Sequence, residues 1–130
     1  MMRKILIIDD DLRHDKMMSY LLLSKGFEPS YALSGEEAIK KLASGEFAKP
    51  VIILMDIMMP GLSGFETMAQ LKKNPELSDI PVIMVSAISD REQQDKAKEI
   101  GATEYIEKPF SPSVVIECIY NILDKDIGDA

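Results

Sequence analysis

Carboxylates follow two apolar segments of this chain, and their type and placement suit them for chemistry. The first segment, at 4–8, runs into three successive aspartates at 9–11, and the second, at 51–55, is closed by Asp56. Apolar segments of this length are typical of strands buried on both faces of a sheet. Open α/β sheets keep their ligand sites at the carboxyl ends of such strands. The two segments therefore predict one acidic site for a metal ion or a phosphoryl group.

Two further polar residues stand at the ends of later strand-like segments. Ser86 closes the segment at 81–85, and Lys108 follows the segment at 103–106. Carboxyl ends of parallel strands meet at one edge of a sheet, so a hydroxyl and an ammonium group are expected beside the carboxylates.

This set of groups suits phosphoryl transfer. Clustered carboxylates repel one another, and a hard cation such as Mg²⁺ relieves the repulsion while keeping open positions for water and phosphate. A carboxylate can also attack phosphorus, and the transfer depends mainly on positioning and charge neutralisation. We expect Asp9, Asp10 and Asp56 to share Mg²⁺. Lys108 and Ser86 are then expected to meet the oxygens of a phosphoryl group on Asp56.

Strand-like and helix-like segments alternate five times along the chain. Ser34 with Glu37 and Ser63 with Glu66 have the spacing of capping boxes at helix starts. Strands are expected at 4–8, 27–32, 51–55, 81–85 and 103–106, and helices at 12–25, 35–44, 64–73, 91–100 and 112–124. The helix at 91–100 has the fewest apolar residues, and is expected to be the least firmly anchored.

Five β-α units predict an α/β fold with one parallel sheet and helices on two faces. We expect a doubly wound, flavodoxin-like domain with strand order 2-1-3-4-5, in which strands one and three bracket the ligand crevice. This domain is expected at 1–124, followed by a frayed polar tail at 125–130 and no effector domain.

Composition limits the classes of partner. The chain has 130 residues, 46% of them hydrophobic, and a formal charge of −7. The acidic charge argues against direct binding of nucleic acid, which requires a basic face. No apolar run has the length of a signal-peptide core or a membrane span, so a cytoplasmic protein without membrane contact is expected.

Four motifs occur in an order and spacing that resemble the receiver domain of bacterial two-component response regulators. They lie at 7–11, 54–61, 81–87 and 108–110. The resemblance implies that Asp56 accepts a phosphoryl group from a phosphohistidine. It also implies that Asp10, Asp56 and the backbone carbonyl of Met58 bind Mg²⁺, with Asp9 acting through water.

The same resemblance implies a switch. Lys108 would contact the phosphoryl group, and its peptide bond to Pro109 would be cis. Ser86 would move toward the phosphoryl group while Tyr105 turns inward. Residues two positions after the acceptor and after Ser86 would set the speed of dephosphorylation. These are Met58 and Ile88, both apolar, which predicts a long-lived phosphate.

The implied partners are a sensor histidine kinase or a histidine phosphotransfer protein. The output protein would contact the fourth helix, the fifth strand and the fifth helix, and a homodimer could form through the same elements. The domain would catalyse only its own phosphorylation and dephosphorylation, and is not expected to be an enzyme acting on metabolites.

Two alternatives remain open at this stage. A Mg²⁺-dependent phosphatase of the haloacid-dehalogenase type also uses an aspartyl nucleophile, but it needs a second aspartate two residues later, where this chain has Met58. The second alternative is a pseudo-receiver that serves only as a scaffold. The complete set of acids, hydroxyl and lysine argues against this alternative.

Overall fold

Five strands and five helices alternate along the chain. The computed structural model describes residues 3–87 and 91–128, without the side chains of 12–15 and 125–128. The strands are β1 (Arg3–Ile8), β2 (Phe27–Ala32), β3 (Ile52–Asp56), β4 (Val82–Ser86) and β5 (Glu104–Glu107). The helices are α1 (Leu12–Ser24), α2 (Gly35–Ser44), α3 (Gly64–Lys73), α4 (Arg91–Glu99) and α5 (Pro112–Gly128).

Nine of these ten elements begin and end within one residue of the predicted positions. The exception is α5, which is predicted at 112–124 but continues to Gly128. The physical reason is that neither glycine nor proline occurs between positions 113 and 127, and nothing there stops the helix.

The strands form one parallel sheet in the order β2-β1-β3-β4-β5, which confirms the predicted doubly wound topology. Ile8 at the end of β1 pairs with Met55, and Asp56 at the end of β3 pairs with Val85 of β4. This register brings the ends of β1, β3 and β4 to the same edge of the sheet. The two acid-tipped strands are direct neighbours.

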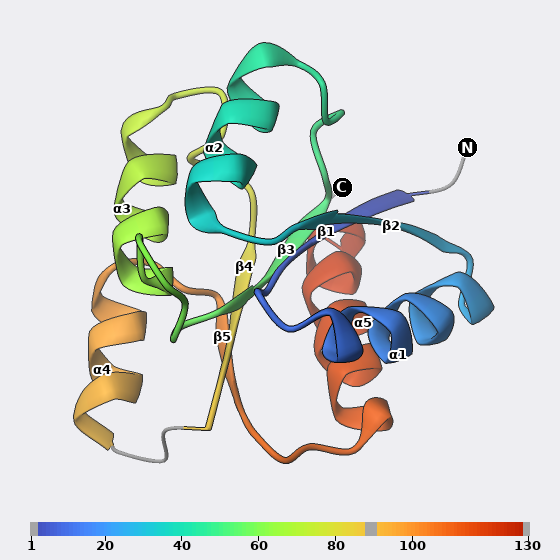
Figure 1. Cartoon of the computed structure of the whole chain (residues 1–130). Coiled ribbons are helices and arrows are strands. Elements are labelled where there is room, and N and C mark those ends of the chain that lie inside the picture. The colour runs from blue at the N-terminus through green and yellow to red at the C-terminus, as the bar shows by residue number, and fades with distance from the viewer. Residues whose placement is uncertain (1–2, 88–90, 129–130) are drawn as a thin grey trace.

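Helices cover both faces of the sheet (Figure 1). Helices α2, α3 and α4 lie on one face, and α1 and α5 lie on the other. Strand β3 serves both cores because its side chains alternate: Ile53 and Met55 pack under α2 and α3, while Ile52 and Leu54 pack toward α5. All four are at most 3% exposed, so the prediction of a strand buried on both faces is confirmed.

The two predicted capping boxes have different outcomes. At α3 both halves of the capping box form. The hydroxyl of Ser63 accepts from the backbone N–H of Glu66 (3.2 Å), and the Glu66 carboxylate accepts from the backbone N–H of Ser63 (3.0 Å). At α2 the hydroxyl of Ser34 accepts from Glu37 (3.1 Å). The Glu37 carboxylate instead accepts from the backbone N–H of Leu33 (3.1 Å), so the reciprocal half of this box is absent.

Helix α4 is weakly anchored, as predicted. Ala97 is its single buried residue within the described part of the chain. Lys96 adds a contact to α3, where its ammonium group lies 4.6 Å from the centre of the Phe65 ring. Little apolar area of α4 is therefore buried against the rest of the domain.

Candidate metal and phosphoryl site

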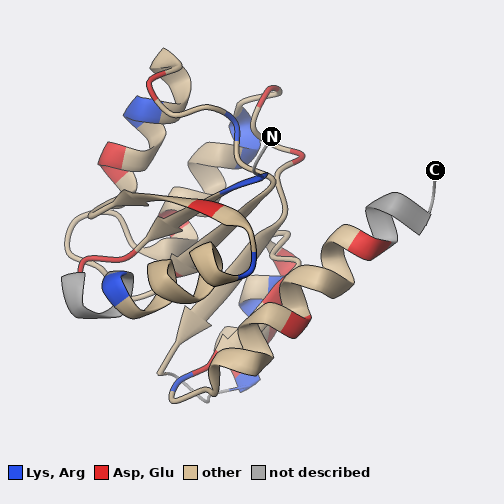
Figure 2. Cartoon of the chain, turned by 90° about the vertical axis from the view of Figure 1, so that its right-hand side faces the viewer, with Lys and Arg blue, Asp and Glu red and all other residues tan. Residues whose placement is uncertain are grey.

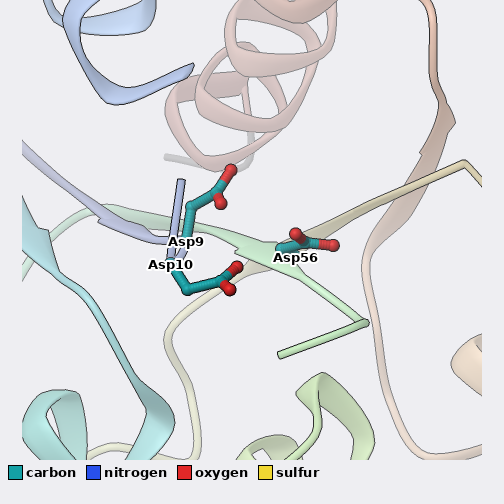
Figure 3. Close-up of side chains that lie close together, drawn as sticks. All are labelled: Asp9, Asp10 and Asp56. Carbon is teal, nitrogen blue, oxygen red and sulfur yellow. The ribbon is translucent and has the colours of Figure 1, made fainter. Parts of the chain in front are cut away.

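Three carboxylates meet where β1 and β3 end. Asp9 and Asp10 follow directly after β1, and Asp56 is the last residue of β3. One oxygen from each carboxylate lies within 4.8 Å of the others. Figure 3 shows the three side chains together at the neighbouring strand ends. The three carboxylates therefore lie together at this edge of the sheet.

Backbone contacts hold the carboxylates in place. The N–H of Asp9 donates to the carbonyl of Ala32 in β2 (3.1 Å), and its carboxylate accepts from the N–H of Asp11 (2.8 Å). The carboxylate of Asp56 accepts from the N–H of Met58 (3.2 Å). The carboxylates of Asp9 and Asp56 are therefore each oriented by the backbone N–H two residues further along the chain.

The start of α3 lies directly against the backbone of β3. The N–H of Gly64 donates to the carbonyl of Ile57 at 2.7 Å. A β-carbon at position 64 would lie 2.6 Å from the carbonyl oxygen of Asp56, closer than real contacts allow. Glycine at this position lets α3 begin close to Asp56.

Lys108 reaches the site from the loop after β5. Its ammonium nitrogen lies 3.6 Å from a carboxylate oxygen of Asp56 and 3.9 Å from one of Asp9. Its backbone N–H donates to the carbonyl of Ser86 (2.8 Å), which ties this loop to the end of β4. The bond between Lys108 and Pro109 is cis, as the resemblance implied.

Burial raises the pKa of Asp56 above its ordinary value, and repulsion from Asp9 and Asp10 adds to this effect. The Lys108 ammonium group and the Met58 N–H oppose it. The ionised form of the Asp56 carboxylate is therefore less stabilised in the folded protein than it would be in water. Clustered oxygen donors with uncompensated negative charge fit a hard divalent cation such as Mg²⁺.

We expect Asp56→Asn to stabilise the metal-free protein at neutral pH. A folded-state pKa above the unfolded one means that the folded protein binds a proton more tightly, so ionised Asp56 costs stability. The cost is complete above the folded pKa and absent below the unfolded pKa. The gain in melting temperature should therefore be largest at neutral pH and fade in acid. Each kcal/mol of added stability raises the melting temperature by roughly 3–6 °C for a domain of this size.

Thermal unfolding in the presence of a chelator, at a series of pH values, measures the difference in melting temperature between wild type and Asp56→Asn. Mg²⁺ should reverse this difference, because the cation stabilises the wild-type protein by mass action, whereas the variant has lost one ligand for it. A variant that melts below the wild-type protein at neutral pH without metal would contradict the pKa argument.

Ser86 and Tyr105 lie outside the carboxylate cluster but share one face of the sheet. Ser86 is 1% exposed at the end of β4. Tyr105 pairs in register with Met84, two residues before Ser86, and packs against the core under α3 and α4. Alternation along β4 places Ser86 on the same face as Met84. Ser86 and Tyr105 therefore both belong to the face of the sheet that α3 and α4 cover.

A cavity of about 930 Å³ opens beside Asp56, between α1 and the loop that follows β5. Its walls are mostly apolar, and Asp9, Asp56 and Lys108 are among the residues that line it. Val85 and Ala87 line it, while Ser86 between them does not. The site is therefore open to a ligand or partner from the side of α1.

The sheet order and the acidic site at its switch point define a doubly wound, flavodoxin-like α/β protein. Residues 5–120 match the family described as the response regulator receiver domain, and the chain belongs to this family. It is therefore a signalling domain of two-component systems and not a classical enzyme.

The chain is similar to several curated regulators and solved structures. It is 34% identical over 123 residues to the phosphate regulon transcriptional regulatory protein PhoB of Escherichia coli (strain K12), covering 95% of this chain and 52% of PhoB. It is 36% identical over 122 residues to the transcriptional regulatory protein CpxR homolog of Haemophilus influenzae, covering 94% of this chain and 51% of the CpxR homolog. The chain thus spans about half the length of these relatives.

Structural likeness extends over the whole domain. A CheY-like receiver domain protein from Methanospirillum hungatei JF-1 superposes with a TM-score of 0.87 at 28% identity, over 100% of both chains. The chemotaxis protein CheY4 of Vibrio cholerae gives a TM-score of 0.85 at 28% identity, covering 93% of this chain and 98% of CheY4.

One residue near the site was not anticipated from the sequence. Glu36, in the first turn of α2, accepts a hydrogen bond from the backbone of Leu62 in the loop that follows β3. The two residues are 26 positions apart. No motif marks Glu36, and only the packing of α2 beside α3 brings it there.

Proposed function

We propose that this receiver accepts a phosphoryl group on Asp56 in a Mg²⁺-dependent reaction and signals through changed protein contacts. The observation that carries the proposal is the position of the Lys108 ammonium group, 3.6 Å from Asp56, beside the cluster of three carboxylates. Carboxylate nucleophile, cation site and fixed positive charge are the parts that phosphoryl transfer requires.

The reaction is a direct transfer. A carboxylate oxygen of Asp56 attacks the phosphorus of a phosphohistidine, an O–P bond forms, and the N–P bond to the imidazole breaks. Lys108 neutralises charge on the phosphoryl oxygens. Asp10, Asp56 and the carbonyl of Met58 would hold Mg²⁺, with Asp9 acting through water. When bound, the cation supplies charge neutralisation at the phosphoryl group.

The switch follows from the placement of Ser86 and Tyr105 on one face of the sheet. Movement of the Ser86 hydroxyl toward a phosphoryl group on Asp56 vacates space that the Tyr105 ring enters. Helix α4 lies on this same face (Figure 1) and is weakly anchored, so it responds to the new packing. The chemical event at the sheet edge thereby changes the surface formed by α4, β5 and α5.

The partners are a sensor histidine kinase or a histidine phosphotransfer protein, and an output protein that binds α4, β5 and α5. A second copy of the chain can use the same surface. Direct binding to nucleic acid is not part of the function of this domain. In the view of Figure 2, basic segments are separated by acidic or neutral ones rather than joined in a broad basic face.

Membrane contact is likewise not part of the proposed function, which belongs in the cytoplasm. Within residues 3–87 and 91–128, no helix combines the length and the apolar character needed to cross a bilayer.

Incubation with a small phosphodonor tests the proposal. Intact-protein mass should increase by one phosphoryl group when Mg²⁺ is present, and should not change when a chelator replaces the metal. Size-exclusion runs of both samples report whether phosphorylation changes association between copies. A protein that stays unmodified with donor and Mg²⁺ would instead behave as a scaffold, and turnover of a phosphomonoester would indicate a phosphatase.

A further inference from the structure

The loop between β3 and α3, residues 57–63, carries a proposed metal ligand on its backbone. The N–H of Met58 is bonded to Asp56, while the side chain of Met58 is 65% exposed. Ile57 and Met59 on either side are buried, at 3% and 8% exposure. The backbone of Met58 is therefore held by its neighbours in the loop, and not by its own side chain.

The far end of this loop is held by Glu36 from another helix. One carboxylate oxygen of Glu36 accepts from the N–H of Leu62 at 3.3 Å. The other lies over Gly61, where a β-carbon would be only 2.5 Å away. Gly61 has a φ of +75°, a conformation that glycine adopts without strain. The carboxylate thus accepts a hydrogen bond from the loop and also packs against it.

The packing of α2 against α3 places the backbone of Glu36. It lies in the first turn of α2, two residues after the Ser34 cap. Helix α2 approaches α3 closely at Gly35, where a β-carbon would clash with the hydroxyl of Thr67. That hydroxyl donates to the carbonyl of Ser63, the residue after Leu62 (2.8 Å). The start of α2 is therefore fixed relative to the loop that Glu36 contacts.

We infer that Glu36 is a positioning residue for Mg²⁺ binding. It is not itself a ligand; its carboxylate oxygen holds the loop that carries the backbone carbonyl of Met58, the ligand proposed to complete the cluster of Asp9, Asp10 and Asp56. The inference rests on the proposed function, because it assumes that this cluster binds Mg²⁺. Residues that orient a ligand from outside the coordination sphere commonly change metal affinity by tenfold or more when they are removed.

Two substitutions separate positioning from simple charge. Glu36→Ala removes the acceptor, and we expect Mg²⁺ affinity of the unphosphorylated protein, measured by titration calorimetry, to fall by about tenfold. Glu36→Gln removes the charge but keeps an amide oxygen that accepts from Leu62, and its affinity should stay within about twofold of wild type. Lys40→Ala, an exposed change on the same helix, should leave the affinity unchanged.

Amide hydrogen exchange at Leu62 reads the bond directly and needs no metal. Exchange should be faster in Glu36→Ala than in the wild-type protein, and close to wild type in Glu36→Gln. Equal Mg²⁺ affinity in wild type and Glu36→Ala would overturn the positioning role alone. Equal losses in the alanine and glutamine variants would assign the effect to charge. A wild-type protein that takes up no Mg²⁺ would overturn the proposed function as well.

Discussion

Asp56→Asn is expected to abolish covalent phosphorylation while leaving the fold intact. The asparagine amide has the shape of the carboxylate, and its oxygen can still accept from the N–H of Met58. It is not a nucleophile toward phosphorus, so no acyl phosphate can form. Intact mass after incubation with donor and Mg²⁺ should show no phosphoryl group on the variant. Its circular dichroism spectrum should match that of the wild-type protein.

Asp79→Asn is the matched control for this experiment. Asp79 is an exposed aspartate that pairs with Lys49 (2.9 Å), away from the residues of the site. The same change of chemical group there should leave phosphorylation at the wild-type rate. Phosphorylation of Asp56→Asn at that rate would place the acceptor elsewhere, and peptide mapping would then distinguish Asp9 from Asp10.

The fold could be predicted because local patterns and chain topology agree. The apolar run at 51–55 has the character of a strand covered on both faces, and all its residues from Ile52 to Met55 are buried. The spacing of Ser63 and Glu66 predicts that α3 begins at Gly64, and the helix begins at that residue. Right-handed crossovers between short β-α units leave few sheet orders, and the observed order is one of them.

The carboxylate cluster could be predicted for the same reason, since residues at the ends of neighbouring parallel strands must meet. The contacts of Glu37, which lies away from the strand ends, could not be predicted in this way. The capping box at Ser34 is half formed because Glu37 has other partners, the N–H of Leu33 and the ammonium group of Lys41. A spacing rule cannot rank partners that compete for one carboxylate in space.

Glu36 shows the same limit at the site itself. Its bond to Leu62 spans 26 residues and depends on how α2 and α3 pack. Neither residue belongs to a motif, and a glutamate in the first turn of a helix usually indicates no more than a favourable interaction with the helix dipole. Long-range contacts of this kind emerge only once the helices are placed.

A phosphoryl group on Asp56 is expected to be long-lived. Hydrolysis needs a water molecule aligned for attack on phosphorus, and a polar side chain near the acceptor can orient it. Met58 is the exposed residue two positions after Asp56, and its thioether is a poor hydrogen-bonding group. Ile88, the other apolar residue of this prediction, lies outside the described residues. The phosphate should therefore persist well beyond seconds once the donor is removed.

The double variant Met58→Asn with Ile88→Glu should shorten the lifetime by about tenfold or more, because it supplies groups that can bind and align water. Met58→Leu is the matched control, since it keeps an apolar side chain and should leave the lifetime unchanged. The decay of the phosphorylated mass in Mg²⁺ buffer, after the donor is removed, measures all three proteins. A wild-type lifetime of seconds, or a double variant as long-lived as wild type, would show that apolar residues at these positions do not control hydrolysis.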